Sequence, residues 1–205
     1  MVQVAGLASA ERAEQLLNPP QLWTRTEVLK SPCPIPSSSG VYAWYFDEVP
    51  PGVPIEGCNQ LGSRFLLYVG ISPREAPRNG GAPSKQSIRT RVRYHFRGNA
   101  EGSTLRLTLG CLLSDVLGIQ LRRVGSGTRL TFSEGEAALS EWMGRHAAVC
   151  WVATEEPWAL EAQLIGRLVL PLNLDQNTNG TFRKALSQVR AKQRERARAL
   201  PTLPR

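Results

Sequence analysis

Three runs of apolar residues predict the strands of a central sheet. They are residues 40–46 (GVYAWYF), 64–71 (RFLLYVGI) and 147–154 (AAVCWVAT). Aromatic and β-branched side chains dominate these runs, as is typical of β-strands. The 64–71 run is nearly all apolar, so we expect it to lie inside the sheet with both faces covered. The first two runs each set a tyrosine close to a glycine.

Helical periodicity and helix-ending residues predict five helices around this sheet. The expected helices cover residues 9–18, 87–97, 103–118, 133–145 and 157–170. Ser133 and Glu136 have the spacing of a capping box, and Pro157 suits the first turn of the last of these helices. The segments IQLRRV and TRLTF flank GSG and predict a hairpin. Residues 22–39 and 47–64 are rich in Pro, Ser or Gly and are predicted to be irregular.

The mixed order of elements indicates an α+β protein. We expect a small mixed or antiparallel three-stranded sheet flanked by helices, with an inserted hairpin and helix and a basic C-terminal helix. A length of 205 residues fits one compact domain, or one domain plus a tail. We divide the chain into a lead-in of residues 1–39, a globular domain of residues 40–180 and a basic tail of residues 181–205.

The predicted helix at 87–97 has an apolar face and two basic edges. The positions on its apolar face are Ile88, Val92 and Phe96. The positions of one basic stripe are Arg89, Arg93 and Arg97, which we interpret as a solvated face. Arg91 and His95 are four residues apart and border the apolar face on the other side. On this helix alone, both side chains are best explained as snorkelling beside the core.

The predicted helix at 157–170 carries a carboxylate on its apolar face. Its apolar positions are Leu160, Leu164, Ile165 and Leu168, and Glu161 falls within their arc. A carboxylate on a core face costs several kcal/mol unless it is paired, protonated or bound to a metal. Arg91 is a candidate structural partner, and a divalent ion is the functional alternative. Asn173 follows twelve residues after Glu161 and suits a turn.

Charge is concentrated at the end of the chain. Residues 181–205 hold eight Lys or Arg residues and one glutamate, so they carry +7 of the net charge of +8. Such a helix either attracts phosphates or forms a solubilising face, and we favour phosphate attraction. No apolar run approaches the ~20 residues of a membrane span, and no signal peptide is recognisable, so we expect no membrane contact and a cytoplasmic location. The four scattered cysteines are interpreted as reduced thiols, without the spacing of a zinc site.

Taken in order, these features resemble the GIY-YIG nuclease superfamily. The elements are GVY, YVG, a helix with Arg91 and His95, Glu161 in LEAQLI, and Asn173 after Pro171. The segment LEAQLIGRLVLPLN is similar to the superfamily's E-x-x-L-I…P-x-N segment, and the Arg-x-x-x-His pair is similar to its restriction-enzyme members. The resemblance spans residues 40–173, and five elements in the same order make chance agreement improbable.

The resemblance implies a one-metal phosphodiesterase site. Tyr42 and Tyr68 would face the substrate, and one of them would help to activate the attacking water. Arg91 would stabilise charge on the phosphoryl oxygens, and His95 would orient groups or relay protons. Glu161 would hold Mg²⁺ or Mn²⁺. Asn173 would brace the site.

The expected activity is therefore that of a metal-dependent endonuclease acting on DNA. Candidate contacts to nucleic acid are Lys85, Arg89, Arg93, Arg183, Lys184 and Arg190. Cleavage of both strands would suggest a homodimer, and a partner protein could supply specificity. Residues 47–64 make the connection between the two tyrosine strands longer than is usual in the family, and could cover or extend the cleft. The alternatives are a catalytically inactive nucleic-acid-binding module and an interaction protein that uses its basic tail.

Overall fold

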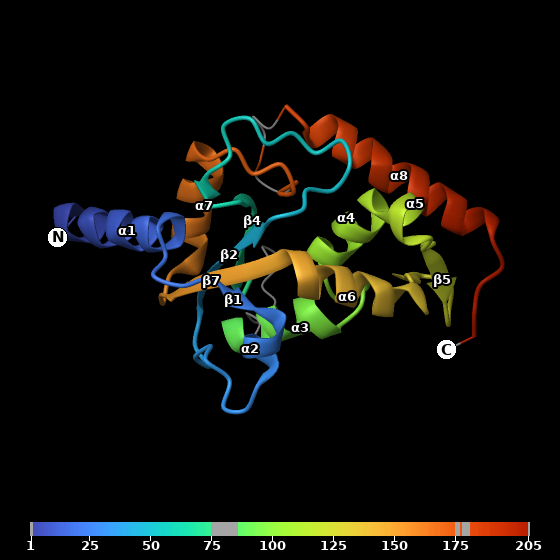
Figure 1. The fold of residues 1–205 in the computed structure, drawn as a ribbon, viewed down its shortest axis with the longest axis horizontal. Helices are drawn as coiled ribbons and strands as arrows, with labels where there is room; N and C mark the ends of the chain where they lie inside the picture. Colours follow the sequence, from blue (N-terminus) through green and yellow to red (C-terminus); the bar gives the residue numbers. More distant parts are fainter. Residues whose placement is uncertain (1, 75–85, 175–176, 178–180, 205) are drawn as a thin grey trace.

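A computed structural model describes residues 2–74, 86–174, 177 and 181–204 of the chain. Its centre is an antiparallel five-stranded sheet in the order β1-β7-β2-β4-β3 (Figure 1). The strands of this sheet are β1 (Trp23–Thr24), β2 (Gly40–Phe46), β3 (Gln60–Leu61), β4 (Arg64–Ser72) and β7 (Ala147–Ala153). The α+β class is confirmed, but the expected number of three strands was wrong. The two additional strands have two residues each, too few to show an alternating pattern.

Eight helices and a separate hairpin surround this sheet in the described part of the chain. The helices are α1 (Val2–Leu17), α2 (Arg25–Leu29), α3 (Ile88–Arg97), α4 (Thr104–Leu112), α5 (Ser114–Leu117), α6 (Gly135–His146), α7 (Pro157–Arg167) and α8 (Arg183–Ala199). The predicted hairpin is confirmed as β5 (Arg122–Val124) and β6 (Arg129–Thr131). Helix α2 lies in a segment that was expected to be irregular. Its Thr24 N–H donates to Glu27 Oε2, the contact of a capping box that our sequence analysis missed.

The predicted helix at 103–118 is two helices rather than one. Leu113, with φ −94° and ψ 4°, separates α4 from α5. At the start of α5 the Ser114 hydroxyl donates to the Cys111 carbonyl, so a side chain binds a carbonyl that a backbone N–H would bind in a continuous helix. Helix α5 ends at Leu117, and the following Gly118 has a φ of 63°, which favours glycine.

Two further details of the predicted helices were wrong. Ser133 has a φ of 49° and lies before the helix, and Glu136 accepts a hydrogen bond from the Phe132 N–H instead of closing a capping box. Helix α7 ends at Arg167 because Leu168 is already extended, with ψ 152°. Pro171 disfavours helical backbone in the residue before it, which is consistent with this early end.

The sheet has a different core on each face. Tyr42, Trp44 and Phe46 of β2 point to the face covered by α3, α4 and α6. Tyr45, with Val41 and Ala43, points to the face covered by α1 and α7. In Figure 1 the N-terminal α1 and α7 accordingly lie at one side of the sheet, and α3 and α6 at another.

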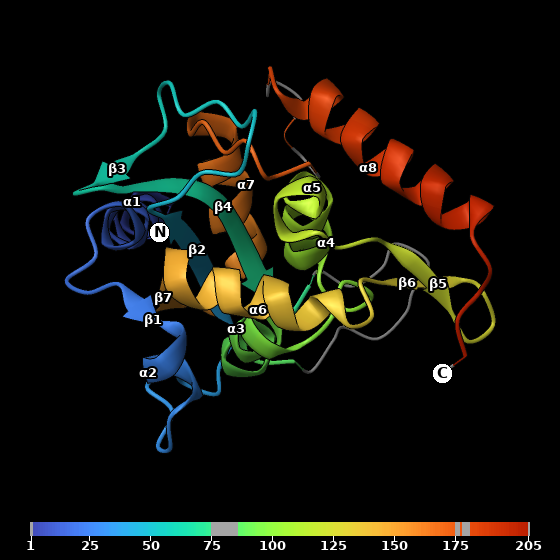
Figure 2. The same ribbon diagram turned by 45° about the vertical axis from the view of Figure 1, so that its right-hand side comes forward.

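Helix α8 lies along α4 rather than extending away from the molecule, and both views show this (Figures 1 and 2). Its buried residues include Leu186 and Ala197, and the buried Gln193 amide donates to the Ser114 hydroxyl. Beyond α8, Leu203 forms a bridge with Val124 of the hairpin. Of the helices in the described ranges, none has the length and apolar character needed to cross a bilayer.

Candidate active site

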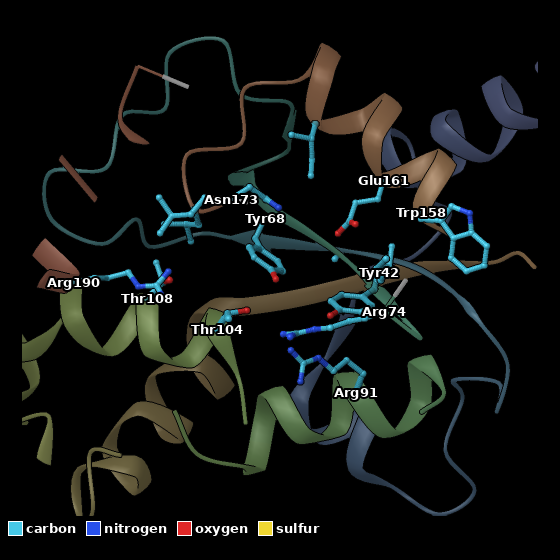
Figure 3. A pocket seen from close by; sticks show the side chains of 15 residues that line it. Tyr42, Tyr68, Arg74, Arg91, Thr104, Thr108, Trp158, Glu161, Asn173 and Arg190 are labelled. Carbon is cyan, nitrogen blue, oxygen red and sulfur yellow. The ribbon is translucent and has the colours of Figure 1, made fainter. Parts of the chain in front are cut away.

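A cleft of about 250 Å³ opens beside β4, and five of the six predicted site residues line it (Figure 3). The five are Tyr42, Tyr68, Arg91, Glu161 and Asn173. They are contributed by β2, β4, α3, α7 and the turn that follows α7, so the cleft exists only when these segments have assembled. Residues 47–64 contribute nothing to its lining, because they connect the far ends of β2 and β4. The sequence left open whether they cover or extend the cleft, and none of them lines it.

The phenol of Tyr42 occupies the space above Gly70, its partner residue on β4. A Cβ atom at position 70 would lie 2.7 Å from the Tyr42 hydroxyl and 2.8 Å from its Cζ atom. These distances are shorter than van der Waals contact, so only glycine leaves the ring where it is. The glycine of YVG is therefore required by the tyrosine of GVY.

A buried chain of hydrogen bonds runs from Tyr42 into the protein. The Tyr42 hydroxyl lies 2.9 Å from His95 Nε2, and His95 Nδ1 lies 2.6 Å from Ser103 Oγ. Ser103 also caps α4, where its Oγ accepts from the Arg106 N–H. Tyr42, His95 and Ser103 are all nearly inaccessible to solvent. A proton can thus pass between the cleft and the histidine without crossing bulk water.

His95 is held as a neutral imidazole. Burial lowers the pKa of His95 well below its usual value, and the positive charges of Arg91, Arg106 and Arg74 add to the effect. Arg106 is fixed behind the ring, since it pairs with Glu136 at 2.6 Å and donates to the His95 carbonyl at 3.1 Å. The neutral ring can therefore accept a proton on one nitrogen while it donates from the other.

Arg91 presents a guanidinium at the floor of the cleft. Its Nη1 donates to the Gly102 carbonyl at 2.6 Å, which fixes the side chain, and the residue is 8% exposed. In Figure 3 the guanidinium of Arg91 and that of Arg74 point toward the hydroxyls of Tyr42 and Tyr68. Arginine has five donors in a rigid fork, so the bond to Gly102 leaves further donors, including one for Tyr42 and others for a phosphate oxygen.

Tyr68 lies on the same face of the sheet as Tyr42, because it pairs with Trp44 in the same unbroken register in which Tyr42 pairs with Gly70. The register between β2 and β4 shifts after Trp44, which pairs with Tyr68, so that Leu67 is an extra residue on β4. Leu67 and Tyr68, although adjacent, consequently contact the same core. Burial raises the pKa of Tyr68, while the Thr104 side chain and Arg91 oppose the rise.

Asn173 closes the edge of β4 next to Tyr68. Its Oδ1 accepts from the Val69 N–H at 2.9 Å and its Nδ2 donates to the Val69 carbonyl at 2.8 Å. The Leu172 N–H also donates to the Leu67 carbonyl. The Asn173 amide and the Leu172 N–H together therefore take the place of a neighbouring strand and hold the backbone on both sides of Tyr68.

Glu161 reaches the cleft from the half-buried side of α7. The buried residues Leu160, Leu164 and Ile165 seat the helix on the opposite face of the sheet. The carboxylate points past the edge of β4 toward the two tyrosines (Figure 3). It lies close enough that its charge raises the pKa of both Tyr42 and Tyr68. It is the carboxylate that lines this cleft among the described residues.

A family model described as the GIY-YIG catalytic domain matches residues 40–192, most of the chain. The protein belongs to the GIY-YIG family. No curated protein and no solved structure matches the chain. Family membership indicates a nuclease of the GIY-YIG type, whose substrate is nucleic acid and whose activity generally depends on a divalent metal.

The basic residues expected to touch nucleic acid are widely separated on the GIY-YIG domain. Arg89 Nε donates to the Ile35 carbonyl and Arg93 Nη1 to the Val28 carbonyl, so neither forms the solvated face that was expected. Arg183 and Lys184 are exposed at the start of α8. Arg190 lines the cleft itself. Lys85 lies outside the described residues.

Several lining residues of the GIY-YIG site carried no signal in our sequence analysis. Arg74 is exposed and follows β4, Thr104 and Thr108 lie one turn apart on α4, and Trp158 lies one turn before Glu161 on α7. A helical wheel could have found Trp158, because positions i and i+3 share a helix face. The other three depend on how α4 and β4 meet in space.

Proposed function

We propose that this protein is a divalent-metal-dependent endonuclease that hydrolyses phosphodiester bonds in DNA. The convergence of two phenols, a guanidinium and a carboxylate on one cleft supports the proposal. These groups match the needs of the reaction, in which an attacking water must lose a proton and negative charge must be stabilised on the phosphoryl oxygens.

The donor set of the cleft fits Mg²⁺ or Mn²⁺ held by Glu161. Magnesium is commonly bound through one or two carboxylates, with water and substrate phosphate as its other ligands. Across the described residues there is no group of three or more His, Cys, Asp or Glu side chains that could hold an ion. A single carboxylate next to a phosphate site therefore suits a hard, hydrated cation. When bound, the ion would polarise the phosphate and stabilise its developing charge.

Tyr42 is the residue we assign to proton transfer. Burial raises the pKa of its phenol well above the usual value, with Tyr68 and Glu161 adding to the rise and Arg91 opposing it, so the phenol stays protonated at neutral pH. A protonated phenol can still accept the proton of the attacking water if it passes its own proton to His95 Nε2. The tautomer that permits this carries its hydrogen on Nδ1, directed at Ser103 Oγ.

The transferred proton leaves His95 as an imidazolium between Arg91 and Arg106, which is unfavourable in the free protein. A bound phosphate offsets this cost, because its negative charge partly cancels the positive charge of Arg91. Arg91 thus has two roles in the proposal: it stabilises charge on the phosphoryl oxygens, and its interaction with the substrate makes His95 a better base.

Arg190 is the basic residue of α8 that we assign to the substrate, since it lines the cleft beside Thr108 (Figure 3). Arg183 and Lys184 are exposed on the same helix and are assigned to phosphates farther along the strand. An inactive binding module is not favoured, because every predicted catalytic position is filled and the side chains are brought together.

Exchanging Glu161 for glutamine tests this function. We expect Glu161→Gln to lower Mg²⁺-dependent DNA cleavage by about 100-fold or more, a loss typical for one group that stabilises developing charge, while DNA binding persists. Cleavage of DNA and RNA oligonucleotides, with Mg²⁺ or with a chelator, provides the measurement. Glu156→Gln is a matched control, because Glu156 is exposed at the start of the same helix and outside the cleft. Equal cleavage rates for the wild type and Glu161→Gln would reject the assignment of Glu161.

A further inference from the structure

Trp158 is an exposed aromatic residue at the rim of the cleft. Its exposed fraction is 38%, and it is one of three large apolar side chains that remain exposed in the described ranges, with Val116 and Val169. It alone of the three lines the cleft. A single exposed apolar residue is common on protein surfaces, so the position of Trp158 matters more than its exposure.

The helix that carries the indole is firmly seated, and the indole lies on the same side of α7 as the carboxylate. Pro157, which is buried, begins the helix, and the buried Leu160 fixes its first turn against the sheet. Trp158 and Glu161 are separated by three residues, so their Cβ atoms lie about 5–6 Å apart on one helix face. This separation is similar to the distance between the phosphate and the base of one nucleotide. Figure 3 shows the indole at the rim, beyond Tyr42.

The rest of the cleft is suited to the backbone of one nucleic-acid strand. In Figure 3 the guanidinium groups of Arg74 and Arg91 lie together beside the two tyrosines, and Arg190 lies farther along the cleft beside Thr108, so more than one phosphate of a strand could bind. Its volume of about 250 Å³ is small even for a ligand pocket. A phosphate with its sugar can enter such a space, and the base attached to that sugar would then lie near the rim, where Trp158 is exposed.

We propose that Trp158 stacks on an unpaired base next to the scissile phosphate, so that the preferred substrate has an unpaired nucleotide at the cleavage point. This inference rests on the proposed nuclease function and narrows its substrate class. Stacking on an aromatic side chain tolerates every base, because each base has a π face. The interaction would offset part of the free energy needed to take a base out of a duplex, and none of that free energy is needed where the base is already unpaired.

Binding measured in the Glu161→Gln background tests the inference without dependence on cleavage. Three DNA ligands of one sequence are compared: a single strand, a complete duplex, and a duplex with a central unpaired loop. We expect Trp158→Ala to weaken binding of the single strand and of the looped duplex by roughly 5- to 100-fold, the effect of losing one stacked base. Binding of the complete duplex should change by less than about 2-fold.

Two further variants separate stacking from a general effect on the surface. Trp158→Phe keeps an aromatic face and should restore most of the lost affinity, whereas Val116→Ala removes exposed apolar area outside the cleft and should have no effect. Quenching of tryptophan fluorescence by the single strand should be smaller in Trp158→Phe than in the protein that retains Trp158. Thermal unfolding of each variant verifies that it is folded.

Unchanged affinity of Trp158→Ala for the unpaired ligands overturns the inference, even if the wild-type protein cleaves DNA. An equal loss of affinity for all three ligands also overturns it, because that result indicates contact with any DNA surface. A loss restricted to the unpaired ligands supports it, even if no cleavage is detected. Failure of the inference and failure of the nuclease function are therefore distinguishable.

Discussion

Two tyrosines three residues apart on β2 show how differently the two faces of the sheet are used. Tyr42 and Tyr45 are both almost inaccessible to solvent, and burial is the largest cause of a raised pKa in each. The Tyr42 hydroxyl lies beside His95 at a cleft, whereas the Tyr45 hydroxyl donates to the Leu16 carbonyl and accepts from the Asn59 amide. Burial and a shifted pKa therefore do not mark a reactive phenol. What distinguishes Tyr42 is a proton acceptor behind it and an open cleft in front.

The largest expected difference between the two faces is in how DNA cleavage responds when each tyrosine loses its hydroxyl. We expect Tyr42→Phe to lower DNA cleavage by about 100- to 10,000-fold, the usual contribution of general acid–base catalysis. Tyr45→Phe should leave cleavage nearly unchanged and lower the free energy of unfolding by about 1–3 kcal/mol, because the Leu16 carbonyl and the Asn59 amide lose a buried partner. Single-turnover cleavage and urea unfolding measure the two effects. Similar cleavage by both variants would show that Tyr42 has no role in proton transfer.

A side chain added at Gly70 is a second way to disturb only the face of the sheet that carries the cleft. We expect Gly70→Ala to displace the Tyr42 ring, because the added methyl group would lie 2.7–2.9 Å from it, and to lower cleavage by about 10- to 100-fold. Gly166→Ala is the matched control on α7, where an added Cβ meets nothing within 4 Å. It should leave cleavage unchanged and stabilise the helix by up to about 1 kcal/mol. Undiminished cleavage by Gly70→Ala would show that the observed position of the phenol is not needed.

The sequence was sufficient to predict the elements that carry the main site residues. The three long strands, α3 and α7 follow from apolar runs and helical periodicity, and the predicted residues Tyr42, Tyr68, Arg91, Glu161 and Asn173 do line one cleft. Periodicity works for α3 and α7 because each has one side that packs against a core, whereas the strands are recognisable as apolar runs because both of their faces are buried. The order of the motifs along the chain then indicated which polar side chains meet.

The details that escaped sequence analysis depend on contacts between distant segments. In a run as uniformly apolar as 64–71, alternation cannot reveal the extra residue Leu67, which lies against the same core as its neighbour Tyr68. Arg74 and Thr104 are ordinary polar residues until β4 and α4 are placed together. Arg89 and Arg93 have the spacing of a solvated stripe, but the segment before β2 supplies carbonyl acceptors to them. Local patterns therefore predicted which elements form more reliably than which side chains are exposed.

The two histidines extend the comparison between the surroundings of the cleft and the rest of the molecule. His95 is fully buried behind the cleft, next to Tyr42, Ser103 and the positive charges of Arg91 and Arg106. His146 is partly exposed and contacts the carboxylates of Asp47 and Glu48 at 3.1 and 3.3 Å. Exchanging each histidine for glutamine removes the imidazole from one environment and retains it in the other.

The smallest predicted effect is a dependence of stability on pH that originates from His95. Its pKa in the folded protein is well below 6.5, the usual value that the unfolded chain retains. Below pH 6.5 the unfolded state therefore binds one more proton than the folded state, and stability decreases as the pH is lowered, by up to about 1.4 kcal/mol per pH unit. Urea unfolding at pH 7.5, 6.5 and 5.5 measures this slope. The difference in the free energy of unfolding between the wild type and His95→Gln should be constant above pH 6.5 and should shrink below it. In His146→Gln, the decrease in stability below pH 6.5 that His95 causes should remain. A difference that stays constant down to pH 5.5 would mean that His95 is not held neutral, and the proton path from Tyr42 would lose its acceptor.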